Sequence, residues 1–247
     1  AGLPDANIGD GDVVQPWGQP NSEAIRGFFN TGYKFDTGIE LYGFGNYSDS
    51  TADGSFFYRF PGNGTIENLR LEDGSVYSPL LIFPGGFTPR FFGDVTDYSV
   101  VGGAKAQLEN GFAFDFSGRF GHNEISYTLA NTINPSLGPD TPTSFQPGDL
   151  INEEVQLQAD FSQEFETGLA SPLLFAFGAS FLDESYELIG GDPASFEAGP
   201  FAAADPFGFC DMGAPTAAGA AVIANGSTLD CADDDDPVYR VVGVGSN

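Results

Sequence analysis

The chain has 247 residues, with 35 acidic residues against 8 basic ones and a formal net charge of −27. Its length is sufficient for one large domain or two small ones, and its acidity repels phosphate groups, which argues against nucleic acid as a partner. The 34 Gly and 17 Pro argue against long helices, while 25 Phe favour an all-β chain of aromatic-rich strands. One His and two Cys, without a nucleophile-elbow, P-loop or dinucleotide motif, predict that the protein is not an enzyme.

Three β-hairpins with short turns are predicted in chain order, at about 24–47, 98–128 and 154–188. Apolar and polar residues alternate with a period of two in the second and third hairpins, which indicates strands with one apolar and one wet face. The turn of the second hairpin contains Asn110 and Gly111, the strongest short hairpin signal.

Long segments separate these hairpins, at about 48–97, 129–153 and 189–247, and we treat 1–247 as a single β-rich segment. Short turns on one side, long loops on the other and strands of about ten alternating residues are typical of an outer-membrane barrel. A soluble acidic β-sandwich that acts as a binding module is an alternative. The number of Phe on single faces and the scarcity of Lys, which usually protects soluble sheet edges, argue against it.

Seven segments of the chain carry a resemblance to a known family, at 41–45, 57–59, 86–89, 131–145, 172–181, 191–196 and 242–247. They resemble TonB-dependent outer-membrane receptors. The resemblance implies an antiparallel barrel of the bacterial outer membrane with an N-terminal plug, which takes up a nutrient or siderophore with energy from TonB. Because the plug and the TonB box are absent from this sequence, we expect an internal fragment of the barrel wall with about six to eight strands.

So few strands of such a barrel cannot close, and an open sheet in lipid leaves edge N–H and C=O groups unpaired at several kcal/mol each. We therefore expect the isolated segment to be a subunit of an extracellular, amyloid-like cross-β filament with copies of itself as partners. The alternative is the wall of an intact transporter, and we expect membrane association only if that parent barrel is intact.

Calcium is the expected cofactor of such a filament. In an in-register stack like side chains repeat about every 4.8 Å, and two carboxylates at that distance repel by about 1 kcal/mol even in water. Calcium accepts six to eight oxygen ligands in flexible geometry, so it can bridge the carboxylates of this acidic chain.

Two kinds of site are predicted, and neither is catalytic. Cys210 and Cys231 are the only cysteines, and they are expected to form a disulfide in an envelope or extracellular setting. Two acidic groups are candidate metal ligands: Asp230, Asp233, Asp234, Asp235 and Asp236 in the last loop, and Asp183, Glu184 and Glu187 at the end of a strand. The first group does not match an EF-hand, and a solvated acidic loop is its alternative reading. His122 is expected to be a surface residue at a strand end.

Overall fold

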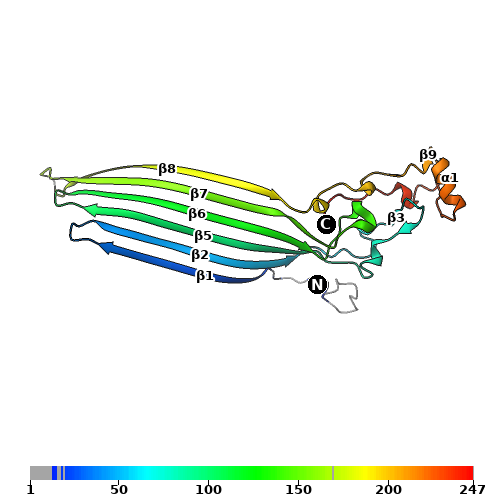
Figure 1. Cartoon of the computed structure of the whole chain (residues 1–247), viewed down its shortest axis with the longest axis horizontal. Helices are drawn as coiled ribbons and strands as arrows, with labels where there is room; N and C mark the ends of the chain where they lie inside the picture. The colour runs from blue at the N-terminus through cyan, green and yellow to red at the C-terminus, as the bar shows by residue number, and fades with distance from the viewer. Residues whose placement is uncertain (1–12, 16–17, 19, 169, 247) are drawn as a thin grey trace.

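The computed structural model describes residues 13–15, 18, 20–168 and 170–246. The prediction of an all-β chain is confirmed, since 51% of the residues lie in strands and 11% in helices. Six long strands form one antiparallel sheet in the order β1-β2-β5-β6-β7-β8, which is not closed into a barrel (Figure 1). The strands are β1 (Asn21–Lys34), β2 (Glu40–Ser55), β5 (Arg90–Gln107), β6 (Phe112–Ala130), β7 (Ser144–Phe165) and β8 (Leu173–Gly190).

Short connections join the strands in pairs at one end of the sheet, where the sequence predicts the three hairpin turns. The turns lie at 35–39, 108–111 and 166–172. In the second turn Gly111 has φ 82°, and the Asn110 side chain accepts a hydrogen bond from the amide of Phe112 at 3.1 Å. A positive φ favours Gly because it lacks a Cβ, so the local sequence sets the position of this turn.

The strands are longer than predicted, so the expected long loops at 48–97 and 129–153 are wrong in extent. β2 continues to Ser55, β5 begins at Arg90 and β7 begins at Ser144, which leaves connections at 56–89, 131–143 and 191 onward. Asp49 and Asp94 lie in these extensions, on the face that is apolar nearer the turns. A strand that becomes polar on its apolar face loses the alternation by which it is recognised.

The connections at 56–89 and 131–143 and the segment from 191 onward pack together at the other end of the sheet, and we call this unit the loop cap (Figure 1). Its short elements are β3 (Leu69–Arg70), β4 (Val76–Tyr77), η1 (Pro79–Leu81), η2 (Pro135–Asp140), η3 (Pro193–Ser195), η4 (Pro200–Ala202), β9 (Cys210–Asp211), β10 (Ala214–Pro215), α1 (Ala217–Ala224) and η5 (Pro237–Tyr239). Three buried apolar clusters lie in the cap. The long sheet contributes only Ala106 and Phe145 to the buried apolar residues of the described chain.

The remaining two sheets of the described chain have two strands each, so no second large sheet packs against the six-stranded one. A β-sandwich needs two sheets with apposed inner faces. The sandwich alternative is therefore wrong as a fold. Within the described ranges no helix is both long enough and apolar enough to span a membrane.

Candidate functional site

One face of the sheet carries an exposed apolar surface in the half nearer the turns, which we call the apolar band. The strand register places apolar side chains from all six strands on this face, among them Phe29, Leu41, Val100, Phe116, Leu157 and Phe181. Each of these six is exposed, with Leu157 at 57% and Phe181 at 60%. Soluble monomers rarely expose a contiguous apolar surface larger than several hundred Å², so the band is a surface that needs a cover.

Nearer the loop cap the same face becomes acidic, and we call this region the acidic belt. Every strand contributes one of its carboxylates: Glu23, Asp49, Asp94, Glu124, Glu153 and Glu187. Any partner that covers this face must therefore be apolar where it contacts the apolar band and must tolerate negative charge where it contacts the acidic belt.

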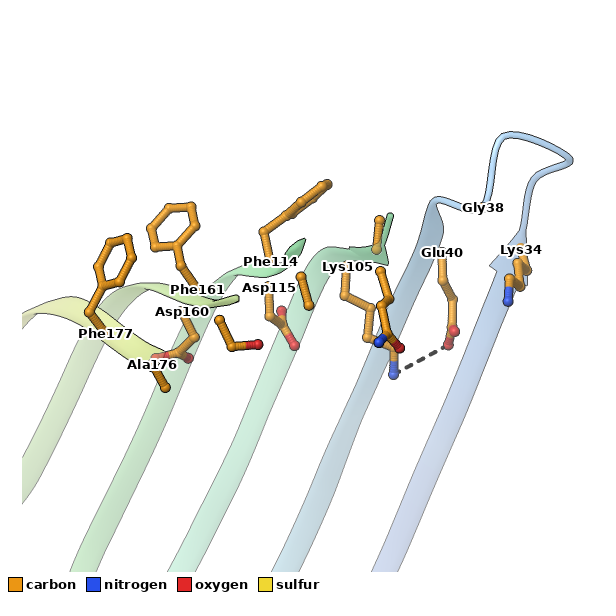
Figure 2. Close-up of a pocket in the computed structure, with 14 residues that line it drawn as sticks. Lys34, Gly38, Glu40, Lys105, Phe114, Asp115, Asp160, Phe161, Ala176 and Phe177 are labelled. Carbon is orange, nitrogen blue, oxygen red and sulfur yellow. Dashed lines mark ion pairs between the residues drawn. The ribbon is translucent and has the colours of Figure 1, made fainter. Parts of the chain in front are cut away.

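The opposite face is polar in the half nearer the turns. Lys34, Glu40, Lys105, Asp115 and Asp160 lie in one row across five adjacent strands (Figure 2). Lys105 forms an ion pair with Glu40 at 3.4 Å, while Asp115 and Asp160 lie directly opposite each other. Like charges that face each other across strands repel, and the row ends at this acidic pair.

Aromatic side chains show how the two faces differ within the same strands. Phe114, Phe161 and Phe177 point away from the charged row, on the side of the apolar band (Figure 2). Tyr42 is an exception on the polar face, where its hydroxyl donates a hydrogen bond to Asp115 at 2.6 Å. The groove over this row is lined by residues from every strand of the sheet.

The two edge strands of the sheet, β1 and β8, have no neighbour on their outer sides within the described chain. Every residue of both strands is exposed. Their outward N–H and C=O groups form a template for pairing with another strand. The apolar band and these two edges are the candidate functional surfaces.

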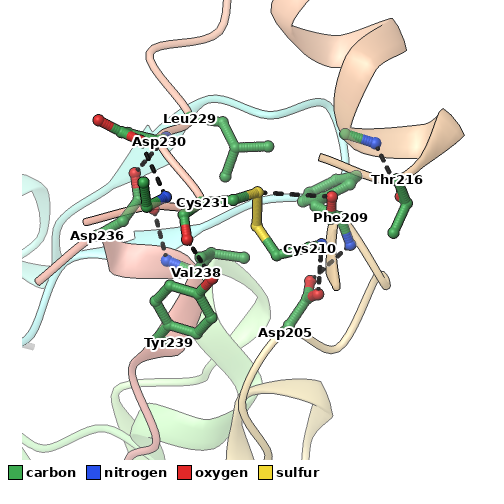
Figure 3. Close-up of a disulfide and its surroundings, with 12 residues drawn as sticks. Asp205, Phe209, Cys210, Thr216, Leu229, Asp230, Cys231, Asp236, Val238 and Tyr239 are labelled. Carbon is green, nitrogen blue, oxygen red and sulfur yellow. Dashed lines mark hydrogen bonds between the residues drawn. A yellow bond between two sulfur atoms is a disulfide. The ribbon is translucent and has the colours of Figure 1, made fainter. Parts of the chain in front are cut away.

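The loop cap contains the predicted disulfide, which is confirmed. Cys210 and Cys231 are joined, with their Cα atoms 5.5 Å apart (Figure 3). The Asp205 carboxylate supports this link by accepting hydrogen bonds from the amides of Phe209 and Cys210, each at 2.8 Å. The disulfide therefore fixes β9 to the segment that precedes η5.

A buried ion pair joins the connection at 56–89 to the segment from 191 onward within the loop cap. Arg70 donates to Asp236 at 2.6 Å, and their side chains are only 2% and 4% exposed. The amides of Val238 and Asp230 also donate to this carboxylate, at 2.8 and 3.0 Å. Burial alone would raise the pKa of Asp236, but these amides and the guanidinium together hold it below its usual range.

Four of the five last-loop carboxylates predicted as metal ligands have separate structural contacts, and the fifth, Asp234, is exposed. Asp236 binds Arg70, as described, and Asp230 and Asp233 each accept a hydrogen bond from an amide two residues further on. Asp235 lies 3.7 Å from Arg240, and its side chain is 90% exposed. Sequence reasoning missed the role of Asp236, because its partner is 166 positions away.

The second acidic group was placed wrongly by the sequence reasoning. Asp183, Glu184 and Glu187 lie within β8, which continues to Gly190, so they are not at the end of a strand. Adjacent strand residues point to opposite faces, so Glu184 cannot share one ligand group with Asp183 and Glu187. No group of three or more His, Cys, Asp or Glu side chains in the described part of the chain is arranged to hold a metal ion.

His122 also lies inside a strand, contrary to the expectation of a strand-end surface residue. Its ring stacks on Tyr98 with centroids 4.8 Å apart. Its Nδ1 lies 3.1 Å from Glu153, its Nε2 lies 3.6 Å from Glu124, and its side chain is 12% exposed. These contacts place it at the border between the apolar band and the acidic belt.

No protein-family model matches this chain, and no curated protein matches its sequence.

Proposed function

We propose that this chain is a non-enzymatic, self-assembling β segment of the TonB-dependent receptor type, which as a free chain forms an extracellular, calcium-stabilised, amyloid-like filament with a structural role. The observation that carries this proposal is the six-stranded antiparallel sheet with two open edges. Copies added edge to edge would place all strands perpendicular to the filament axis, about 4.8 Å apart, which is the cross-β arrangement.

The apolar band supports association in a second direction. A ribbon of such sheets would expose a continuous apolar stripe, because each copy presents the band on the same face. Two ribbons packed through these stripes, at about 10 Å, would bury the aromatic side chains of both. The filament would then have two layers with their polar faces outward.

The acidic belt supports the calcium part of the proposal. Each added copy of a chain with net charge −27 increases the negative charge of the ribbon, and the belt places one carboxylate per strand along it. Calcium bound by these oxygens would offset the repulsion between copies. The ion would bridge different copies, which does not require a complete site within one chain.

A second candidate function is favoured by the difference between the two sheet faces. An apolar band on one face, opposed by a polar row, is the pattern of a barrel strand between lipid and lumen. In that case the chain would form part of the wall of an intact TonB-dependent transporter in a bacterial outer membrane. Further strands of the transporter would then cover β1 and β8, and lipid would cover the band.

Electron microscopy and fibre diffraction of the purified chain test the proposal, with and without a calcium chelator. We expect filaments in detergent-free buffer, with reflections near 4.8 and 10 Å, that dissociate when calcium is removed. Filaments that persist in chelator would refute the calcium role alone. Ring-shaped particles that require detergent would refute the filament and support the transporter wall.

A further inference from the structure

The two open edges of the sheet run in opposite directions, because the sheet has six strands and every neighbouring pair is antiparallel. When β1 of one copy is laid antiparallel to β8 of the next, both loop caps lie at the same end. The apolar bands then also lie on the same face. Residues of an antiparallel strand direct their N–H and C=O groups alternately to one neighbour and to the other. With an even number of strands, the outward N–H groups of one edge can therefore lie opposite the outward C=O groups of the other edge.

Charge distinguishes the two edges. All eight basic residues of the chain lie in the described part, and five of them form ion pairs with carboxylates. Of the three that form none within the described residues, Arg59 lies in the loop cap, whereas Arg26 and Lys34 both lie in β1. β8 instead carries three carboxylates and no basic residue. With Arg26 and Lys34 against the single carboxylate Glu23, β1 has a formal charge of +1, whereas β8 has −3, so the two edges are complementary in charge.

Strand length restricts the alignment to two registers. β1 has 14 residues and β8 has 18. If every β1 residue lies opposite a β8 residue and the apolar faces coincide, Lys34 lies opposite either Leu174 or Ala176. A shift of one residue between these two would place the apolar residues of one copy on the polar face of the other.

Cross-strand partners decide between the two registers. With Lys34 opposite Ala176, Arg26 lies opposite Glu184 and Phe29 lies opposite Phe181. With Lys34 opposite Leu174, Arg26 instead lies opposite Leu182, an apolar residue of β8. Opposite charges and aromatic pairs across strands stabilise a sheet, so the Ala176 register is favoured. Its one like-charge contact, between Glu23 and Glu187, lies in the acidic belt.

Asp160 adds an independent contact to this register. Its carboxylate lies over Gly178 on the outermost strand: a Cβ at Gly178 would meet an Asp160 oxygen. In the Ala176 register the Lys34 ammonium of the next copy enters beside Gly178, on this same polar face. The acidic end of the charged row thus meets the basic end of the same row in the neighbouring copy.

We propose that copies of this chain join through β1 and β8 in this register, with Arg26 of one copy opposite Glu184 of the next. The interface is head to tail, so it repeats and produces an open ribbon or a closed ring. This inference rests on the proposed self-assembly and adds the identity of the contacting strands and their alignment.

A charge-reversal cycle tests the pairing, with the critical concentration for assembly measured by sedimentation. Arg26→Glu and Glu184→Arg are each expected to raise it about fivefold, since each creates a like-charge cross-strand pair. The double variant restores it, because every interface then carries the reversed pair. The matched control combines Arg26→Glu with Asp183→Arg, which lies on the opposite face and opposite the uncharged Gly27 of the next copy, and restores nothing. Circular dichroism checks that all variants keep the β content of the unmodified chain.

Cysteine cross-linking tests the register in the chain without charge-reversal substitutions, whose described part contains no free cysteine. A chain with Phe29→Cys mixed with a chain with Phe181→Cys is expected to give oxidised dimers. Phe29→Cys mixed with Ala179→Cys, which are opposite each other in the Leu174 register, is expected to give few. The reverse result would overturn the proposed register.

Two further outcomes separate the interface from the proposed function. Filaments that form without rescue by the double charge reversal would overturn the β1–β8 interface and leave self-assembly intact. A chain that stays monomeric at high concentration would overturn both, and would leave the edges to strands of a longer protein.

Discussion

The stability of the loop cap depends on the ion pair between Arg70 and Asp236, and Asp236→Asn tests this dependence. The substitution keeps the shape of the side chain and removes its charge. Arg70 is 2% exposed and would be left as a buried cation without a counter-ion. Breaking a buried pair by removal of one partner costs about 3–5 kcal/mol. Because the amide oxygen of Asn still accepts hydrogen bonds, we expect the lower end, about 3 kcal/mol.

Hydrogen exchange measures this loss locally. A loss of about 3 kcal/mol raises the opening constant of the cap on the order of 100-fold, so amides such as Val238, which donates to the carboxylate, should exchange faster by that factor. Asp235→Asn is the matched control, since the Asp235 side chain is 90% exposed and lies 3.7 Å from Arg240. An exposed pair contributes about 0–1 kcal/mol. Equal effects of the two substitutions would refute the reasoning.

Three further outcomes are expected. Cys210–Cys231 closes a loop with a separation of 21 residues, so its reduction should destabilise the cap by about 3 kcal/mol. The amides of the long sheet should keep their protection from hydrogen exchange, and a uniform loss of protection would contradict this expectation. Leu157→Lys in the apolar band should abolish assembly, whereas Gln158→Lys on the opposite face, where Gln158 donates to an acidic side chain, should assemble normally; equal assembly would show that the band stays uncovered. The stability that Asp236 contributes is complete above the ordinary carboxyl pKa of about 4 and is lost as the pH falls through its lower pKa in the folded chain. Hydrogen exchange measured at decreasing pH should therefore show the cap opening in this range, and the Asp236→Asn variant should lack this step.

The local features of the fold were predictable because they depend on neighbours in the sequence. The pair Asn110 and Gly111 sets a turn through its own backbone preference and side chain. The alternation around Phe116 and Leu157 follows from the pleat of a strand, which sends successive side chains to opposite faces. The three hairpins, the single apolar face and the link between Cys210 and Cys231 therefore needed no knowledge of distant contacts.

The tertiary structure decided what depends on residues far apart in the chain. Asp236 reads as one more carboxylate in an acidic run, and only the fold brings it to Arg70, 166 positions away. Asp49 and Asp94 interrupt the apolar alternation, yet their strands continue, because pairing with neighbouring strands holds the backbone extended. The open edges of the sheet are another feature that only the tertiary structure decided. The order of strands in space, and not the sequence of β1 or β8 alone, determines which backbone groups remain without a partner.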